Sequence, residues 1–287
     1  MKDRLVVGFD GSEASTAAVR WAAAEAEVRG ASVRVMSSYA LPPVMDFYGM
    51  GATGATVGQL EELKKSCEAA LHDVVERVAR EHPTVGFDLH AVDVAPVRCL
   101  VDEAADADLL VVGSNGLGAV RDFILGSVTG AVLHDSPCPV VVVPATLRSE
   151  SFGKVVVGVD GSDRAMAALR WAAAEADRRK ADLIVLHAWE YPYRMTSEGF
   201  ARGSSLAEID AEILLEQAVT IARDEMSGTV IGRLAHEGAA QALLHSLDEA
   251  DLLVVGSRGR GGFRRMLLGS VAHAVSAHAS CPVVVVR

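Results

Sequence analysis

Short runs of apolar residues alternate along this chain with longer stretches in which apolar residues recur every three or four positions. In the first half of the chain, the short runs cover residues 5–9, 32–37, 87–92, 109–112 and 140–143. They are rich in β-branched residues and mostly continuous, as is typical of parallel strands that are buried on both faces. The pattern therefore predicts five parallel strands in this half.

The stretches between these runs have the spacing of amphipathic helices. Ser12 is a plausible N-cap for a helix that runs through Trp21. Residues 61–80 predict a second helix, Pro96 marks the start of a third, and residues 127–134 predict a fourth. Strands that alternate with helices through right-handed crossovers form a doubly wound α/β sheet.

The whole pattern occurs twice. Three segments return almost unchanged, with residues 4–12, 20–26 and 108–114 repeated as residues 154–162, 170–176 and 251–257. The offset is 150 positions from Asp10 to Asp160 but 143 from Asp108 to Asp251, so we expect a shorter connection in the middle of the second copy. The repeat predicts two domains, 1–146 and 152–287, with a linker within residues 144–153.

Two stretches interrupt the regular alternation of strands and helices. Residues 41–58 contain two prolines and four glycines, and residues 191–205 take the corresponding place in the second copy. Both are predicted to be long loops that follow the second strand. Loops of this length either cover a ligand or are simply mobile, and the sequence leaves both alternatives open.

Composition narrows the classes of function. A net charge of −11 argues against a general nucleic-acid binder and against a protein that binds anionic membranes. No apolar stretch approaches the roughly 20 residues that span a bilayer, and nothing at the start resembles a signal peptide, so we expect a cytoplasmic protein. The four cysteines lack a C-x-x-C spacing and are expected to be reduced packing residues, and no metal site is predicted.

Glycine and serine residues follow the fourth strand of each copy. The first copy has Gly113 and Gly116, then nine residues, then Gly126 and Ser127; the second copy repeats this with Gly256, Gly259, Gly269 and Ser270. We expect the first glycine to leave room for a ligand and the second to adopt a positive φ. The glycine–serine pair opens a helix, whose free N–H groups and positive dipole end favour an anion. The pattern predicts a phosphate site without a Walker lysine.

These motifs resemble those of the ATP-binding universal stress protein family in its tandem-domain form. The resemblance rests on V-G-x-D-G-S at the first strand, followed by G-x-x-G, nine residues and G-S after the fourth, in the same order in both copies. It implies two doubly wound five-stranded parallel-sheet domains of the adenine nucleotide α-hydrolase-like, Rossmann-like type. It also implies ATP as the ligand, with or without Mg²⁺.

The resemblance further implies which residues surround the nucleotide. Adenine and ribose would lie against the ends of the first two strands, and the phosphates along the glycine motif. The implied residues are Gly8, Asp10, Ser38, Gly113, Gly116, Gly126, Ser127 and Val128 in the first domain, and Gly158, Asp160, Ala188, Gly256, Gly259, Gly269, Ser270 and Val271 in the second. The alternative for the two aspartates is a cap or turn role, and for the glycines mere turn formation.

The two copies differ in charge around the second glycine motif. The second copy has Arg258, Arg260, Arg264 and Arg265 where the first has Asn115, Leu117, Arg121 and Asp122. These arginines are either solvated surface charges or groups that make the second site bind triphosphate more tightly. On the second interpretation Arg258 joins the candidate binding residues.

The last strand of each copy, residues 140–143 and 283–286, is highly apolar, and an exposed edge of this kind invites pairing. The resemblance implies that these strands pair domain to domain within the chain, with a homodimer of whole chains beyond that.

Three functions remain open: a nucleotide-dependent regulator in stress response, a slow ATPase or ATP-dependent adenylylating enzyme, and a dimerisation module without a physiological ligand. The motif loops show no catalytic base or carboxylate pair for magnesium, which favours the regulator without robust catalysis.

Overall fold

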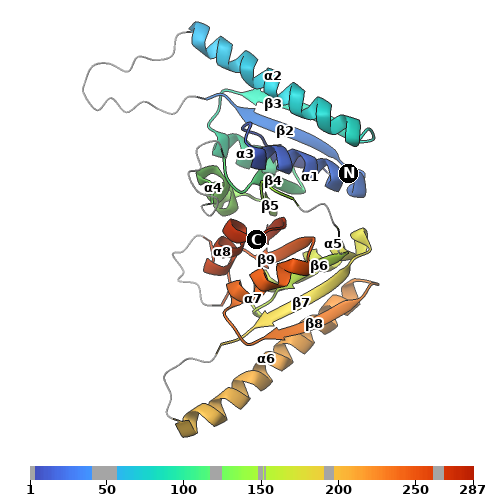
Figure 1. Ribbon diagram of the computed structural model, residues 1–287, viewed down its shortest axis with the longest axis vertical. Coiled ribbons are helices and arrows are strands. Elements are labelled where there is room, and N and C mark those ends of the chain that lie inside the picture. The colour runs from blue at the N-terminus through green and yellow to red at the C-terminus, as the bar shows by residue number, and fades with distance from the viewer. Residues whose placement is uncertain are drawn as a thin grey trace, which may run out of the picture.

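A single twisted sheet runs the length of the molecule, with helices on both faces (Figure 1). The computed structural model describes residues 4–40, 57–116, 125–147, 151, 153–190, 197–260 and 268–287. At residues 57 and 197–206 it describes the backbone alone.

Strands and helices alternate in both halves, as the sequence predicts. The first half contains β1 (Arg4–Gly8), α1 (Glu13–Arg29), β2 (Ser32–Ser38), α2 (Val57–Glu81), β3 (Gly86–Val92), α3 (Pro96–Ala104), β4 (Leu109–Gly113), α4 (Ser127–Asp135) and β5 (Val140–Val143). The second half contains β6 (Lys154–Gly158), α5 (Asp163–Arg179), β7 (Asp182–Ala188), α6 (Ser197–Glu225), β8 (Val230–Ala235), α7 (Ala239–His245), a 3-10 turn (Ser246–Glu249), β9 (Leu252–Gly256), α8 (Ser270–His278) and β10 (Val283–Val286).

The strand order is β3-β2-β1-β4-β5-β10-β9-β6-β7-β8. All neighbours are parallel except β5 and β10, which pair antiparallel with Val141 opposite Val284. The predicted pairing between the last strands is therefore confirmed, and it joins two five-stranded parallel sheets into one. Within each half the first and fourth strands are neighbours, so the sheet has its switch point where the sequence analysis expects it.

Each strand contributes to two apolar layers because successive side chains point to opposite faces. On β1, Leu5 and Val7 pack into the layer under α1, α2, α5 and α6, whereas Val6 packs into the layer under α3, α4, α7 and α8. Burial on both faces explains why the strands are continuous apolar runs.

The prediction of a loop over residues 191–205 is wrong in its second part, because α6 begins at Ser197. Residues 41–56 of the other predicted loop lie outside the described residues, as do 191–196 and part of the predicted linker. The length difference between the copies falls between the second and third strands. Val33 pairs with Phe87, whereas its counterpart Leu183 pairs with Val230.

Candidate functional site

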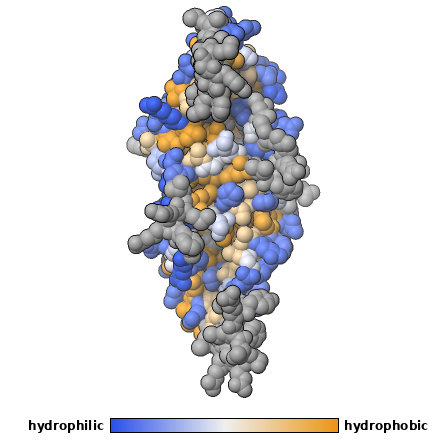
Figure 2. Space-filling model, turned by 90° about the vertical axis from the view of Figure 1, so that its left-hand side faces the viewer, coloured by the Kyte–Doolittle hydropathy of each residue, from blue (hydrophilic) through white to orange (hydrophobic). Residues whose placement is uncertain are grey.

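A cavity opens in each half at the carboxyl ends of the strands, beside the switch point. The first cavity has a volume of about 660 Å³ and the second about 440 Å³. Both lie within the range of about 300–1,000 Å³ that is usual for small-molecule sites. Figure 2 faces this edge of the molecule, where apolar surface lies among hydrophilic side chains.

The candidate residues of each copy come together in these cavities. The first cavity is lined by Gly8, Asp10, Ser38, Gly113, Gly116, Gly126, Ser127 and Val128. The second is lined by Gly158, Asp160, Ala188, Gly256, Arg258, Gly259, Gly269, Ser270 and Val271. Parallel strands place their carboxyl ends along one edge of a sheet, so residues more than a hundred positions apart converge there. Their role in binding stays a prediction.

The sequence analysis missed the apolar part of each lining. Met36 on β2 and Leu100 on α3 line the first cavity, and Leu186 and Leu243 take the same places in the second. Pro96 is the residue in the sequence that could have predicted this part of the lining, because a helix that starts there brings its first turn to the same edge of the sheet as the glycine motif.

Cys99 also lines the first cavity, where its Sγ donates to the carbonyl oxygen of Pro96 at 3.3 Å. Burial raises the pKa of the Cys99 thiol to about 11. The thiol is therefore protonated at neutral pH and is a poor nucleophile.

The two aspartates shape the turn before the first helix of each half. Oδ1 of Asp10 accepts a hydrogen bond from the Ser12 N–H at 3.0 Å, and Oδ1 of Asp160 accepts one from the Ser162 N–H at 2.9 Å. Ser12 and Ser162 then cap α1 and α5, as predicted for Ser12. The turn role weighed for these aspartates is therefore present, on residues that also line the cavities.

Gly113 and Gly256 have a packing role that the sequence analysis did not predict. A Cβ on Gly113 would lie 2.7 Å from the backbone carbon of Ala14, and one on Gly256 would lie 2.8 Å from that of Arg164. These glycines let the first turn of α1 or α5 approach the sheet. What a side chain would crowd is the backbone of a helix.

The expectation of a positive φ at Gly116 and Gly259 is wrong. Glycines with positive φ lie instead in the loops after the first strands, where φ is 85° at Gly11 and 76° at Gly161. A Cβ on Gly116 would instead lie 2.5 Å from Oδ2 of Asp10, and one on Gly259 would meet Oδ2 of Asp160. These glycines let the loop after the fourth strand contact the aspartate after the first.

The predicted helix starts are present. Gly126 is the N-cap of α4 and Gly269 that of α8, and neither helix has a side-chain cap. Ser127 and Ser270 are therefore the first helical residues, and the first turns of both helices line the cavities. An uncapped helix start with its positive dipole end is suited to binding an anion.

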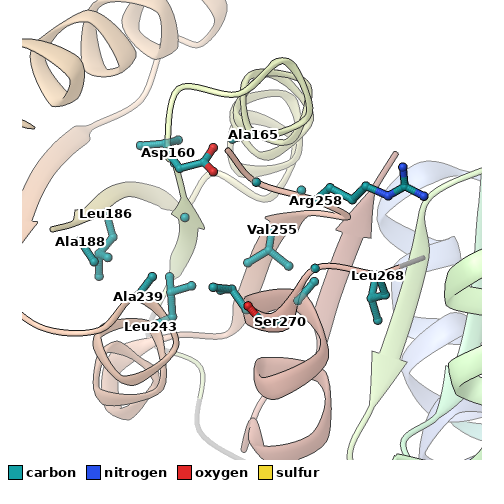
Figure 3. A pocket seen from close by; sticks show the side chains of 17 residues that line it. Asp160, Ala165, Leu186, Ala188, Ala239, Leu243, Val255, Arg258, Leu268 and Ser270 are labelled. Atoms are coloured by element: carbon teal, nitrogen blue, oxygen red, sulfur yellow. The ribbon is translucent and has the colours of Figure 1, made fainter. Parts of the chain in front are cut away.

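Ser38 lines the first cavity at the end of β2, and Ala188 lines the second at the end of β7. The Ser38 hydroxyl donates to the carbonyl oxygen of Val94 at 2.6 Å and so ties the end of β2 to the residues after β3. Ala188 lies beside Leu186 at the apolar end of the second cavity (Figure 3).

The arginines expected around the second glycine motif are placed differently from one another. Arg258 lines the cavity, and Figure 3 shows its guanidinium at the end farthest from Ala188. The Arg260 N–H donates to Oδ2 of Asp160 at 2.8 Å, and its guanidinium lies near the Gly161 carbonyl oxygen. Arg264 and Arg265 lie outside the described residues.

Two further observations concern the described part of the chain only. It holds no group of three or more histidine, cysteine or carboxylate side chains placed to bind a metal ion. None of its helices combines the length and the apolar character that crossing a bilayer requires.

The model of the universal stress protein family matches this sequence twice, over residues 1–144 and 151–287. This chain belongs to that family. A universal stress protein of Mycolicibacterium smegmatis is 35% identical, over 99% of this chain and 96% of that protein. A universal stress protein of Archaeoglobus fulgidus has the same fold, with a TM-score of 0.67 at 21% identity over 99% of this chain and 98% of the other.

A further universal stress protein, solved in complex with cAMP, matches 50% of this chain and 98% of its own length. Its identity is 28% and its TM-score 0.38, and cAMP is the ligand of that protein.

Proposed function

We propose that this universal stress protein binds an adenine nucleotide, with ATP as the ligand, in each of its two cavities and acts as a nucleotide-dependent regulator in stress response. The observation that carries the proposal is the polarity of each cavity. In the second cavity, Leu186 and Ala188 form an apolar end, and the uncapped start of α8 lies between this end and Arg258 (Figure 3). Met36, Ser38 and the uncapped start of α4 line the first cavity. A planar base suits the apolar end, and phosphates suit the helix start.

The phosphates would be held mainly by backbone N–H groups. Each charge-assisted hydrogen bond of this kind contributes about 1.5–3 kcal/mol, so three or four suffice for a nucleotide without a Walker lysine. Any Mg²⁺ would be held by the phosphates rather than by a carboxylate cluster. Binding is preferred to catalysis because Cys99 is a protonated thiol and the cavity aspartates are engaged in turns.

Calorimetry with ATP on ligand-stripped protein tests the proposal. We expect two sites in the wild type and one in each of Gly126→Asp and Gly269→Asp, because a carboxylate at the helix start repels phosphate. Gly86→Asp is the control, since a side chain there meets nothing within 4 Å. Absence of binding by every adenylate tested contradicts the proposal.

Turnover of labelled ATP separates a binding protein from the alternative of a slow ATPase or an adenylylating enzyme. We expect at most stoichiometric conversion, whereas many turnovers per site would favour the enzyme. A homodimer of whole chains and a cytoplasmic location stay predictions.

A further inference from the structure

Three arginines of the second half gather near the end of its cavity where the phosphates are proposed to lie. Arg258 lines the cavity itself. Arg164 stands in the first turn of α5, and its Nη1 donates to Oγ of Ser257 at 3.1 Å. Arg287 follows β10, and its Nη1 donates to the carbonyl oxygen of Ser136 in the first half at 2.7 Å.

These arginines act on one another electrostatically. Burial, and after it the neighbouring charges of Arg164 and Arg258, hold the pKa of the Arg287 guanidinium below its ordinary value, and only Asp135 acts in the opposite direction. Among the residues that the structure describes, neither Arg164 nor Arg287 forms an ion pair with a carboxylate. Like charges gathered at one site favour an anion that neutralises them.

The first half has no arginine at the three equivalent positions. The positions equivalent to Arg164, Arg258 and Arg287 are occupied by Ala14, Asn115 and Pro144, although the surrounding strands and helices correspond. The two cavities therefore share their apolar ends and helix starts but differ in positive charge at one end.

The order of the lining residues along the second cavity fits this difference in positive charge. In Figure 3, Leu186 and Ala188 lie at one end, Ser270 is near the middle and Arg258 lies at the other end. A nucleotide with its base against Ala188 would extend its phosphates past Ser270 toward the arginines. Each added phosphate would bring negative charge closer to the cluster.

We infer that Arg164, Arg258 and Arg287 form a polyphosphate subsite, which makes the second cavity select a nucleoside triphosphate over a monophosphate while the first discriminates little. The inference rests on the proposed function for the base and adds the class of ligand that each cavity takes. A guanidinium–phosphate contact is worth a factor of about 10 or more in affinity.

Single-site variants test the inference. Gly126→Asp should leave only the second cavity able to bind nucleotide, and Gly269→Asp only the first. We expect the ratio of the AMP Kd to the ATP Kd to be about 10-fold or more larger in the second cavity. Adding Arg258→Gln or Arg164→Gln to Gly126→Asp should lower that ratio about 10-fold, whereas Arg170→Gln, on an exposed arginine of α5 outside the cavity lining, should not change it.

Equal ratios in the two cavities would overturn the inference, as would glutamine variants that weaken AMP and ATP by the same factor. Thermal melting identifies variants that fail to fold, and the two glutamine variants are independent tests.

Inorganic tripolyphosphate separates this inference from the proposed function. It should bind to the Gly126→Asp protein, and Arg258→Gln should weaken that binding about 10-fold. Arginine-dependent binding of tripolyphosphate without binding of any adenylate would refute the proposed function and leave the subsite standing. Binding of adenylates with no arginine-dependent binding of tripolyphosphate would refute the subsite and leave the proposed function standing.

Discussion

Five charged side chains form a network between the two halves, at the ends of α1 and α5 that lie away from the cavities: Glu25, Arg29, Glu175, Arg179 and Arg178, which pairs with Glu175. Arg29 and Arg179 each pair with both Glu25 and Glu175, with 2.5 Å between Arg29 and Glu175 and 2.6 Å between Arg179 and Glu175. The guanidinium of Arg29 also lies 5.8 Å from the ring centroid of Trp171.

Burial makes this network sensitive to the loss of one member. The side chain of Glu175 is 0% exposed and that of Arg29 only 6%. Burial acts against the charge of Glu175, but Arg179 and Arg29 outweigh it, so the pKa of this carboxyl lies below its ordinary value. For Glu25 burial prevails, and its pKa is raised. The two carboxylates therefore titrate as a pair.

We predict that Glu175→Ala lowers the free energy of unfolding by about 3–5 kcal/mol, the usual cost of leaving a buried charge without its partner. Because the free energy of unfolding of a native protein is typically about 5–15 kcal/mol, this loss would be a large fraction of the total stability. The shift of the urea midpoint measures this change in the free energy of unfolding. The slope m shows whether the unfolding transition stays cooperative.

The matched control is Asp73→Ala on α2. Asp73 pairs with Arg77 across one helical turn, but its side chain is 71% exposed, so we expect a loss below about 1 kcal/mol. Glu25→Ala, the counterpart of Glu175→Ala, should resemble it rather than the control. If Glu175→Ala cost no more than Asp73→Ala, the claim that burial makes this network sensitive to the loss of one member would be refuted.

Two further predictions concern single residues. Gly113→Ala should destabilise the protein by about 1–3 kcal/mol, because its Cβ would lie 2.7 Å from the backbone of a helix. Gly86→Ala is the control and should change the urea midpoint little, because a Cβ there meets nothing within 4 Å. Similar shifts of the midpoint for both variants would contradict the packing role of Gly113. The neighbouring side chains of His90 and Arg34 lower the pKa of Asp88, so the contribution of this carboxylate to stability is present above about pH 4 and is lost as the pH falls through its folded pKa. Asp88→Asn should therefore be less stable than the wild type at pH 7, and the difference in stability should shrink as the pH falls below about 4. A difference that is independent of pH would refute this.

The sequence by itself determined the elements and their repetition. Apolar runs and helical spacing depend on neighbours within a few positions, so they predicted the strands and the capping of α1 by Ser12. The topology of parallel strands then brought the candidate residues to two cavities, because their carboxyl ends share one edge of the sheet. The helical start of α6 at Ser197 was missed because residues 191–205 were assigned as a loop from their place in the repeat, opposite residues 41–58.

Only the tertiary structure decided what individual residues do at the points where elements meet. Gly113 belongs to a glycine motif that suggests ligand contact, yet its immediate neighbour is the backbone of Ala14, almost a hundred positions away. Glu25 and Arg29 have the spacing of an ordinary surface pair, and only the approach of α5 buries them. Burial and charge depend on what packs against a residue, and a local pattern does not contain that information.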